Sequence, residues 1–158
     1  ITRQFIPIQQ EFDYLEDFAE IYRYIHGDRL TVKFECSEAV RDALLPTMIL
    51  QPVLENAFEH GMRGSKKKTL ISVSAKIEDV DKLAISIVDD GPGIPKDVKN
   101  RIFQPDFQRK DARTGVGLQN VAERLEICYA DNAGILVESG GSGTTVKIIL
   151  PLSYISKL

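Results

Sequence analysis

The sequence DDGPGIP, residues Asp89 to Pro95, directly follows the apolar run LAISIV at residues 83–88. That run alternates and is rich in β-branched residues, which predicts a strand that is partly or fully buried in a sheet. Taken alone, the two acids and the glycines on either side of a proline favour an ordinary turn, because Asp-Gly and Pro-Gly pairs are common in turns. The rest of the chain changes that interpretation.

The bulk composition is that of an ordinary globular domain and limits the classes of partner. The chain has 158 residues, enough for one domain with a substantial core, and is 43% apolar and 27% charged. A net charge of -3 and a pI near 5.5 argue against general nucleic-acid binding, which needs a basic surface. Cys36 and Cys128 lie outside any CxxC pattern, which favours a reduced, intracellular setting without excluding one disulfide. No apolar run approaches the roughly 20 residues that span a bilayer.

Hydrophobic periodicity predicts helices interleaved with antiparallel strand pairs. Helices are expected at 10–26, 47–61, 96–103 and 115–130, and strands at 30–35, 69–77, 82–88, 134–139 and 144–150. Gly27 and Gly61 are predicted helix stops, and Pro52 marks a point where the second helix either starts or bends. The polar segment 104–114 is a predicted mobile loop. This order predicts an α+β fold, a two-layer α/β sandwich in which a mixed sheet of about five strands packs on about three helices.

The helix at 47–61 carries polar residues that a purely structural helix would not need. Asn56 and His60 lie four residues apart and share a face, and Glu55 and Glu59 form a second such pair. An amide oxygen is a suitable ligand for Mg²⁺, which commonly takes one or two protein oxygens together with substrate phosphates and water. Since Asn is a mediocre helix former in a helix interior, Asn56 is interpreted as functional, whereas Glu59 is interpreted as facing water.

A second candidate is TGVGLQNV at residues 114–121, where Gly115 and Gly117 stand at the change from loop to helix. Glycines let the backbone approach a ligand closely, and the first N–H groups of a helix bind anions, so the pattern predicts a phosphate site. It is not a Walker A loop, which needs Gly-Lys-Ser/Thr, and it is not a dinucleotide fingerprint, because Asn120 stands where the third glycine would be.

The carboxylate of Asp89 supplies the third feature. At a strand end it can accept a hydrogen bond from the exocyclic amine of adenine, whereas guanine presents a carbonyl oxygen there. A hydrogen bond to a charged group contributes roughly 1.5–3 kcal/mol, which corresponds to about a tenfold to hundredfold preference. Together, the three features predict an adenine nucleotide site.

Four stretches, LQPVLENAFEHG, DDGPGIP, TGVGLQNVAERL and GGSGTTVKIILP, resemble in order the N box, G1 box, G2 box and final glycine motif of the Bergerat-fold (GHKL) ATP-binding domains. That superfamily includes DNA gyrase B subunits, heat-shock-90 chaperones, mismatch-repair proteins and histidine kinases. Within it, ILQPVLENAFEHG and GVGLQNVAERLEICYAD look most like the LytS-like sensor histidine kinases of bacterial two-component systems. The resemblance covers nearly the whole chain and implies the Bergerat fold with a mobile ATP lid at 104–114.

The resemblance also implies roles for single positions. Asp89 would bind the adenine amine, and Asn56 would ligate Mg²⁺. Glu55 and His60 join Asn56 as candidate catalytic residues, with the role of Glu55 left open because it lies about 100° around the helix from Asn56. The other implied nucleotide-binding positions are Gly91, Gly93, Ile94, Phe103, Arg113, Thr114, Gly115, Val116, Gly117, Leu118 and Thr144.

Two positions depart from the pattern of the family. Related ATPases that activate water carry a Glu four residues before the Asn, where this chain has Pro52. Efficient hydrolysis is therefore not expected, which suits a kinase that delivers phosphate to a protein side chain. Many histidine kinases carry a Lys three residues after the Asn, where this chain has Glu59. Either Arg109, Lys110, Arg113 or His60 supplies that positive charge, or phosphate binding is weak.

The leading hypothesis is the ATP-binding catalytic domain of a bacterial sensor histidine kinase, a cytoplasmic domain of an inner-membrane protein. Residues 1–27 would be a helical segment leading from a dimerisation and phosphoacceptor module, and residues 28–158 the ATP-binding domain. No acceptor motif ending like PHFLFN occurs here, and His26 is interpreted as a surface residue. The implied partners are ATP, that module, a response regulator and, in the full-length protein, a second copy of the chain.

Two alternatives remain. A nucleotide-binding regulatory module with lost phosphotransfer is favoured by Glu59. An anti-sigma-factor-like Ser/Thr protein kinase would share the fold but lacks the LQPVLENA motif. Phosphohistidine on an added acceptor module would support the leading hypothesis, whereas ATP binding without transfer would support the regulatory module.

Overall fold

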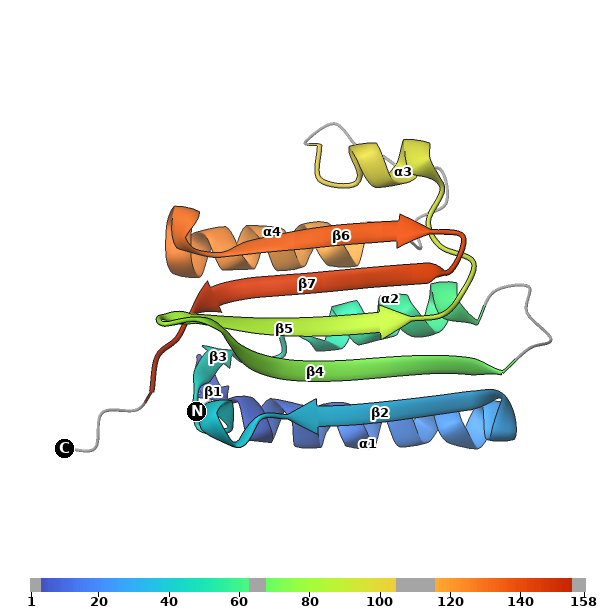
Figure 1. Ribbon diagram of the computed structural model, residues 1–158, viewed down its shortest axis with the longest axis horizontal. Helices are drawn as coiled ribbons and strands as arrows, with labels where there is room; N and C mark the ends of the chain where they lie inside the picture. The colour runs from blue at the N-terminus through green and yellow to red at the C-terminus, as the bar shows by residue number, and fades with distance from the viewer. Residues whose placement is uncertain (1–3, 63–67, 105–115, 155–158) are drawn as a thin grey trace.

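A five-stranded mixed sheet forms the frame of the molecule in the computed structural model, which describes residues 4–62, 68–104 and 116–154 (Figure 1). The strand order is β2-β4-β5-β7-β6. Its members are β2 (Leu30–Cys36), β4 (Thr69–Asp79), β5 (Lys82–Asp89), β6 (Gly134–Gly140) and β7 (Gly143–Pro151). The β2–β4 pair is parallel and the other three pairs are antiparallel, so the predicted mixed sheet is confirmed.

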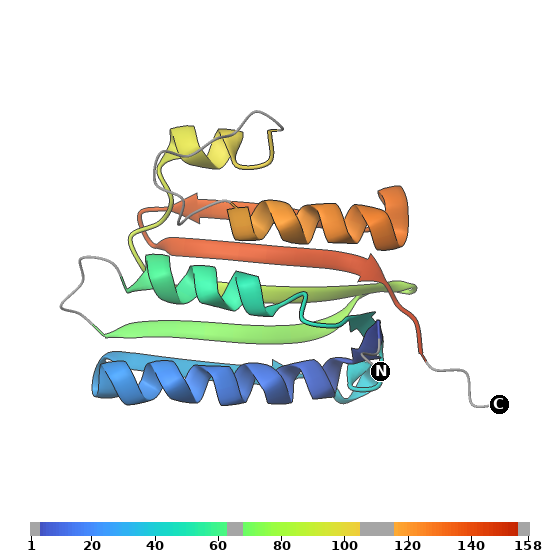
Figure 2. The same ribbon diagram turned by 180° about the vertical axis from the view of Figure 1, so that it is seen from behind.

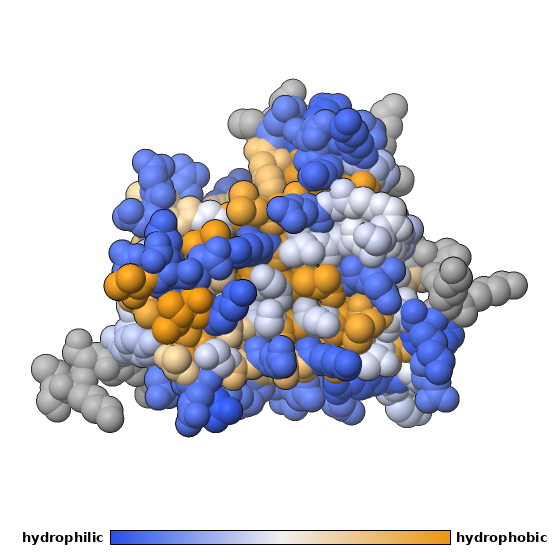
Figure 3. All heavy atoms as spheres, viewed as in Figure 1, coloured by the Kyte–Doolittle hydropathy of each residue, from blue (hydrophilic) through white to orange (hydrophobic). Residues whose placement is uncertain are grey.

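Three helices cover one face of this sheet, as the two opposite views in Figures 1 and 2 show. They are α1 (Ile8–His26), α2 (Gln51–Gly61) and α4 (Val116–Tyr129), while the short α3 (Lys96–Arg101) lies outside this layer near the end of β6. None of the described helices lies over the other face of the sheet, and Figure 3 shows polar and apolar side chains intermixed there. The predicted two-layer α+β sandwich is confirmed.

The core lies between the sheet and the helices, because the strands bury alternate residues and the three covering helices bury the residues along one face. In β4, alternate residues Ile71, Val73 and Ala75 are buried, and Ser72 and Ser74 between them face the open side. In α1, Phe12, Leu15 and Ala19 join the same apolar cluster. Helix α1 is therefore part of the common core. The predicted boundary between residues 1–27 and the ATP-binding domain stays a prediction.

Two helix boundaries follow from glycine and proline chemistry. The last residue of α1 is followed by Gly27 at φ 56°, so the predicted helix stop is confirmed. Helix α2 begins at Gln51 and has Pro52 in its first turn, where the missing N–H of proline breaks no helical hydrogen bond. Of the two alternatives for Pro52, the helix therefore starts there and does not bend.

A second, two-stranded sheet was not predicted from the sequence. Strands β1 (Phe5–Pro7) and β3 (Leu44–Pro46) pair antiparallel and have three residues each, too few to show a period. Glu11, four residues beyond β1, then reaches the start of α2. Its buried carboxylate accepts hydrogen bonds from the backbone N–H groups of Met48 at 3.0 Å and Leu50 at 3.1 Å. This side chain from α1 thus caps the N-terminus of α2 from outside that helix.

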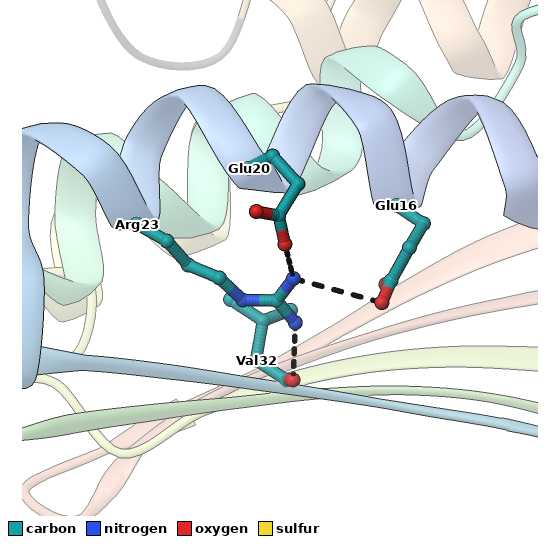
Figure 4. A network of polar contacts seen from close by, with 4 residues as sticks. All are labelled: Glu16, Glu20, Arg23 and Val32. Atoms are coloured by element: carbon teal, nitrogen blue, oxygen red, sulfur yellow. Dashed lines mark hydrogen bonds and ion pairs between the residues drawn. The ribbon is translucent and has the colours of Figure 1, made fainter.

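The edge strand β2 is protected by a side chain from the helix behind it. Arg23 of α1 donates to the backbone oxygen of Val32 at 2.8 Å and is held by Glu16 at 3.6 Å and by Glu20 (Figure 4). A carbonyl of an edge strand is otherwise available to pair with another chain. The Arg23 guanidinium therefore blocks part of this edge.

The structure bears on two sequence-based expectations, which concern membrane-spanning helices and the state of the two cysteines. Among the described residues, no helix is both long enough and apolar enough to cross a bilayer. Cys36 and Cys128 are free thiols, half-buried at separate places in the fold.

Candidate nucleotide-binding site

Helix α2 directs two of its polar side chains inward and one outward. Asn56 is 8% exposed and His60 is 9% exposed, although both are polar, so the helix buries them on one face. Glu55 is exposed and lies near Tyr22 of α1. Burial raises the pKa of the Tyr22 hydroxyl, and the negative charges of Glu55 and Glu59 add to this shift. The structure thus brings Asn56 and His60 together and does not bring Glu55 to them.

The C-terminal end of α2 meets the C-terminal end of β5. A β-carbon on Gly61 would lie 3.3 Å from the β-carbon of Asp89, and the hydroxyl of Thr69 donates to the Gly61 carbonyl at 3.3 Å. Asp89 is 5% exposed, and its Oδ1 accepts a hydrogen bond from the Gly91 N–H at 3.0 Å. The end of α2, one residue after His60, therefore lies beside the buried Asp89 side chain.

The two acids of the DDGPGIP stretch have different environments. Burial raises the pKa of Asp89, although the hydrogen bond from Gly91 opposes the shift. Asp90 accepts a hydrogen bond from the backbone N–H of Leu70 at 2.8 Å and so fixes the end of β5 against β4. Asp89 is available to a ligand as a buried acceptor, whereas Asp90 has a structural task.

The turn after β5 (residues 90–95, here called the G1 turn) packs on the β6–β7 hairpin. Gly93 has φ 81°, and a β-carbon there would lie 2.2 Å from the Gly140 carbonyl oxygen. A β-carbon on Gly143 would lie 2.0 Å from the backbone oxygen of Asp89, so neither position has room for a side chain. The G1 box and the final glycine motif, about 50 residues apart in the sequence, thus form one wall.

The other two site positions on this wall are buried. Ile94 is 7% exposed, and Thr144 is 4% exposed and pairs with Asp89 across the β5–β7 ladder. The backbone of Thr144 also lowers the pKa of Asp89, against the larger effect of burial. Asp89, Ile94 and Thr144 are therefore brought together, as their common assignment to the adenine site requires.

The start of α4 lies against the start of α2. Val116 is the first helical residue, so Gly117 stands in the first turn, where N–H groups have no partner inside the helix. A β-carbon on Gly117 would lie 3.6 Å from the β-carbon of Pro52, and Leu118 is fully buried. The predicted change from loop to helix at Gly115–Gly117 is compatible with this start. Arg113, Thr114 and Gly115, the side chain of Val116 and the lid beyond Gln104 lie outside the described residues.

Phe103 lies on the α4 side of this region. It is 39% exposed and lines a cleft of about 260 Å³ with Gln119, Ala122 and Glu123. Gln119 donates from Nε2 to the backbone oxygen of Ile102 at 2.8 Å and thereby ties α4 to the segment after α3. The structure places Phe103 in this cleft and not with Asp89, Ile94 and Thr144.

The surroundings of Asn56 suit a magnesium ion that binds together with a nucleotide, and they do not suit a metal ion held by the protein alone. No group of three or more His, Cys, Asp or Glu side chains among the described residues is arranged to hold a metal ion. Mg²⁺ keeps several waters and usually takes one or two protein oxygens beside substrate phosphates. One amide oxygen on a buried polar face satisfies that demand.

A protein-family model decides the broader identity. The model described as "Histidine kinase-, DNA gyrase B-, and HSP90-like ATPase" matches residues 41–154, more than half of the chain. The chain belongs to this family.

Curated relatives of the chain include sensor proteins named LytS. The LytS of Staphylococcus epidermidis is 28% identical over 148 residues, which are 92% of this chain and 24% of the relative. The LytS of Oceanobacillus iheyensis is 22% identical over 99% of this chain and 27% of its own length. The chain spans about a quarter of the length of these relatives.

Solved structures show the same fold for this ATPase-family chain. The catalytic domain of the histidine kinase ThkA superposes with a TM-score of 0.72 at 17% identity, covering 98% of this chain and 99% of that one. The histidine kinase domain of the blue-light activated kinase of Erythrobacter litoralis gives a TM-score of 0.66 at 21% identity, over 96% of this chain and 65% of that one. The predicted Bergerat fold is confirmed.

Several residues of the site were not found from the sequence. Ser139, Thr69 and Gln119 make hydrogen bonds that hold the walls of the site, yet none of them breaks a local pattern. Glu11 did carry a signal, because it falls on the buried stripe of α1 between Ile8 and Phe12. A charged residue in an apolar stripe indicates a buried partner.

Proposed function

We propose that this chain is the ATP-binding catalytic domain of a bacterial sensor histidine kinase. It would transfer the γ-phosphate of ATP to a histidine on a helical module outside this sequence. The observation that carries the proposal is the buried Asp89 carboxylate beside the end of α2, whose inner face carries Asn56 and His60. Membership of the ATPase family supports ATP as the ligand, and a relative in Staphylococcus aureus, 27% identical, is the "Sensor histidine kinase/phosphatase LytS".

The nucleotide would bind between α2, the G1 turn and the start of α4. Asp89 accepts a hydrogen bond from the adenine amine, with Gly91, Gly93, Ile94 and Thr144 shaping the wall around the base. The N–H groups at Gly117 and Leu118, with Arg113, Thr114, Gly115 and Val116 before them, bind the phosphates at the start of α4. Asn56 would hold Mg²⁺, which supplies charge neutralisation on the phosphates when bound.

Transfer to a protein side chain suits this site better than hydrolysis. Pro52 occupies the position from which related ATPases activate water, and its ring lies against Gly117. Proline has no side-chain base, so water is not activated from there. An imidazole that enters from a separate helix needs no such base, because it is itself the nucleophile.

The remaining partners and the location follow from the same proposal. A structure of ThkA holds the response regulator protein TrrA, which supports a response regulator as the final phosphate acceptor here. We place residues 1–27 next to a dimerisation and phosphoacceptor module, in a homodimer on the cytoplasmic side of the inner membrane. The second candidate is a regulatory module with lost phosphotransfer, favoured by the half-buried Glu59 three residues after Asn56.

The test has two stages. The 158-residue chain is titrated by calorimetry with a non-hydrolysable ATP analogue, in Mg²⁺ and in EDTA, with the GTP analogue as control. Mg²⁺-dependent, adenine-selective binding is expected, and its absence would remove the ATP site. The chain is then mixed with a helical acceptor module and radiolabelled ATP. Acid-labile, alkali-stable label on the module supports the kinase, whereas binding without transfer to any module supports the regulatory candidate.

A further inference from the structure

Ser139 of β6 belongs to none of the ligand-binding motifs, yet it contacts two of them. The backbone N–H of Ile94 in the G1 turn donates to the Ser139 hydroxyl at 2.6 Å. The same hydroxyl lies 2.9 Å from the Thr144 hydroxyl and 3.4 Å from the Gly143 carbonyl oxygen. One small side chain therefore joins the G1 turn to the strand that pairs with Asp89.

We propose that Ser139 is a positioning residue of the adenine site. It holds the G1 turn at the distance that the purine needs and fixes the orientation of the Thr144 hydroxyl opposite Asp89. This inference rests on the proposed ATP-binding function and deepens it, because it names a determinant of adenine selectivity that does not itself touch the base.

The G1 turn depends on this contact because its outer side is open. A groove of about 630 Å³ lies between the turn and the β6–β7 hairpin, and the residues that line it include Pro92, Ile94 and Pro95 on one side and Ser139, Gly140 and Gly141 on the other. Pro92 and Pro95 are exposed, so their rings do not fix the turn from that side. On the inner side, Gly93 already touches Gly140. Without the Ser139 hydrogen bond, the turn therefore has open space beside it in which to shift from its position.

The second consequence concerns the hydroxyl of Thr144. This hydroxyl is buried, and Thr144 is the cross-strand neighbour of Asp89. When Ser139 is present, the two hydroxyls share a hydrogen bond, which limits the directions in which the Thr144 proton points. When Ser139 is absent, that proton has the Asp89 carboxylate as a nearby acceptor, in competition with the adenine amine. Loss of Ser139 should therefore weaken ATP binding more than GTP binding.

Three variants separate this role from general stability. Ser139→Ala removes the hydroxyl, Ser139→Thr keeps it on a residue that suits a strand, and Ser86→Ala removes a hydroxyl from the open face of the same sheet. Each is measured for the dissociation constants of the ATP and GTP analogues, for the midpoint of thermal unfolding, and for hydrogen exchange of the Ile94 amide by NMR in the nucleotide-free chain. Ser139→Cys, with similar volume but a weak hydrogen-bonding group, replaces Ser139→Ala if that variant does not fold.

For Ser139→Ala, exchange of the Ile94 amide is expected to be about tenfold faster and ATP affinity about fivefold to tenfold lower. The ratio of ATP to GTP affinity should fall, Ser139→Thr should restore it, and Ser86→Ala should leave it unchanged. If the parent chain binds ATP and Ser139→Ala behaves like Ser86→Ala, the inference is wrong and the proposed function stands. An equal loss for both nucleotides without rescue by Thr overturns it too, because Ser139 would then be merely structural. If the parent chain binds no ATP, both proposals fail together.

Discussion

A β-carbon on Gly91 would lie 2.5 Å from the α-carbon of Gly61 and 2.9 Å from its carbonyl oxygen. The end of α2 and the G1 turn thus touch backbone to backbone, and this contact sets the distance between the Asn56 face and Asp89. Gly91 therefore has no room for a side chain, because the atoms at Gly61 that a β-carbon would meet belong to the main chain.

Gly91→Ala is therefore expected to abolish ATP binding and to lower the free energy of unfolding by about 1–3 kcal/mol, as overpacking against a backbone does. Calorimetry with the ATP analogue and urea unfolding measure the two effects. Gly134→Ala is the matched control, since a β-carbon at Gly134 meets nothing within 4 Å. A Gly91→Ala variant with the parent affinity would show that α2 and the G1 turn are free to separate.

Asp89→Asn should remove most of the preference for adenine. The amide keeps the size of the side chain but replaces a charged acceptor, so ATP affinity is expected to fall by about tenfold to hundredfold. The measurement is the ratio of ATP to GTP dissociation constants. Asp90→Asn serves as control, because Asp90 bonds the Leu70 N–H and not the ligand wall. An unchanged ratio in Asp89→Asn would remove Asp89 from the site.

Asn56→Ala should abolish the difference between ATP binding in Mg²⁺ and in EDTA. Its amide oxygen is the proposed metal ligand, and it lies on the buried face of α2. Glu55→Gln is the neighbouring control: Glu55 is exposed on the α1 side of the helix, so its loss should leave the Mg²⁺ dependence intact. Loss of Mg²⁺ dependence in Glu55→Gln, with Asn56→Ala unaffected, would exchange the roles of the two residues.

Glu11→Ala should destabilise the fold by about 2–3 kcal/mol, because it leaves the part-buried N–H of Met48 and the buried N–H of Leu50 without their acceptor. Urea unfolding gives this change in the free energy of unfolding, with the dependence on urea concentration (the m-value) held equal for the parent and the variant. Glu16→Ala, which removes an exposed ion pair with Arg23, should cost less than about 0.5 kcal/mol. Equal effects of the two variants would mean that α2 is capped in another way.

The stability contribution of Glu11 should also depend on pH. Burial raises its pKa above the ordinary value of 4.5, against the opposing effects of the Leu50 and Met48 hydrogen bonds and of Arg124. The folded state then binds the Glu11 proton more tightly than the unfolded state does. This contribution is fully present below pH 4.5 and is lost as the pH rises through the folded pKa.

The difference in unfolding free energy between the parent and Glu11→Gln isolates that contribution. Measured by urea unfolding at steps from pH 4.5 to neutral, the stability of the parent relative to Glu11→Gln should fall as the pH rises, and then become constant. A difference that grows with pH would mean that the hydrogen bonds and Arg124 outweigh burial and that the pKa is lowered.

Periodicity predicted the layered fold because each large element repeats its apolar pattern over two or more turns or pleats. Helix α1, with Phe12, Leu15 and Ala19 buried, and strand β4, with Ile71, Val73 and Ala75 buried, both follow their expected period. The β1–β3 pair was missed because three residues carry no period. Glu11 was missed as a cap because its partners, Met48 and Leu50, lie nearly 40 residues away.

The sequence by itself determined the fold class and the order of the four motifs, and it made Asp89 and Asn56 candidate ligand-binding residues, because residue type and short spacing carry that information. Only the tertiary structure decided which of the neighbouring polar residues face the site. Glu55 and Asn56 differ by one position, yet the way α2 packs on the sheet leaves the first exposed and buries the second. The backbone contact of Gly61 with Gly91 and the hydrogen bond from the Ile94 N–H to the Ser139 hydroxyl join positions that are 30 and 45 residues apart. They exist only once strand register and helix packing have set the distances, and no local pattern encodes those.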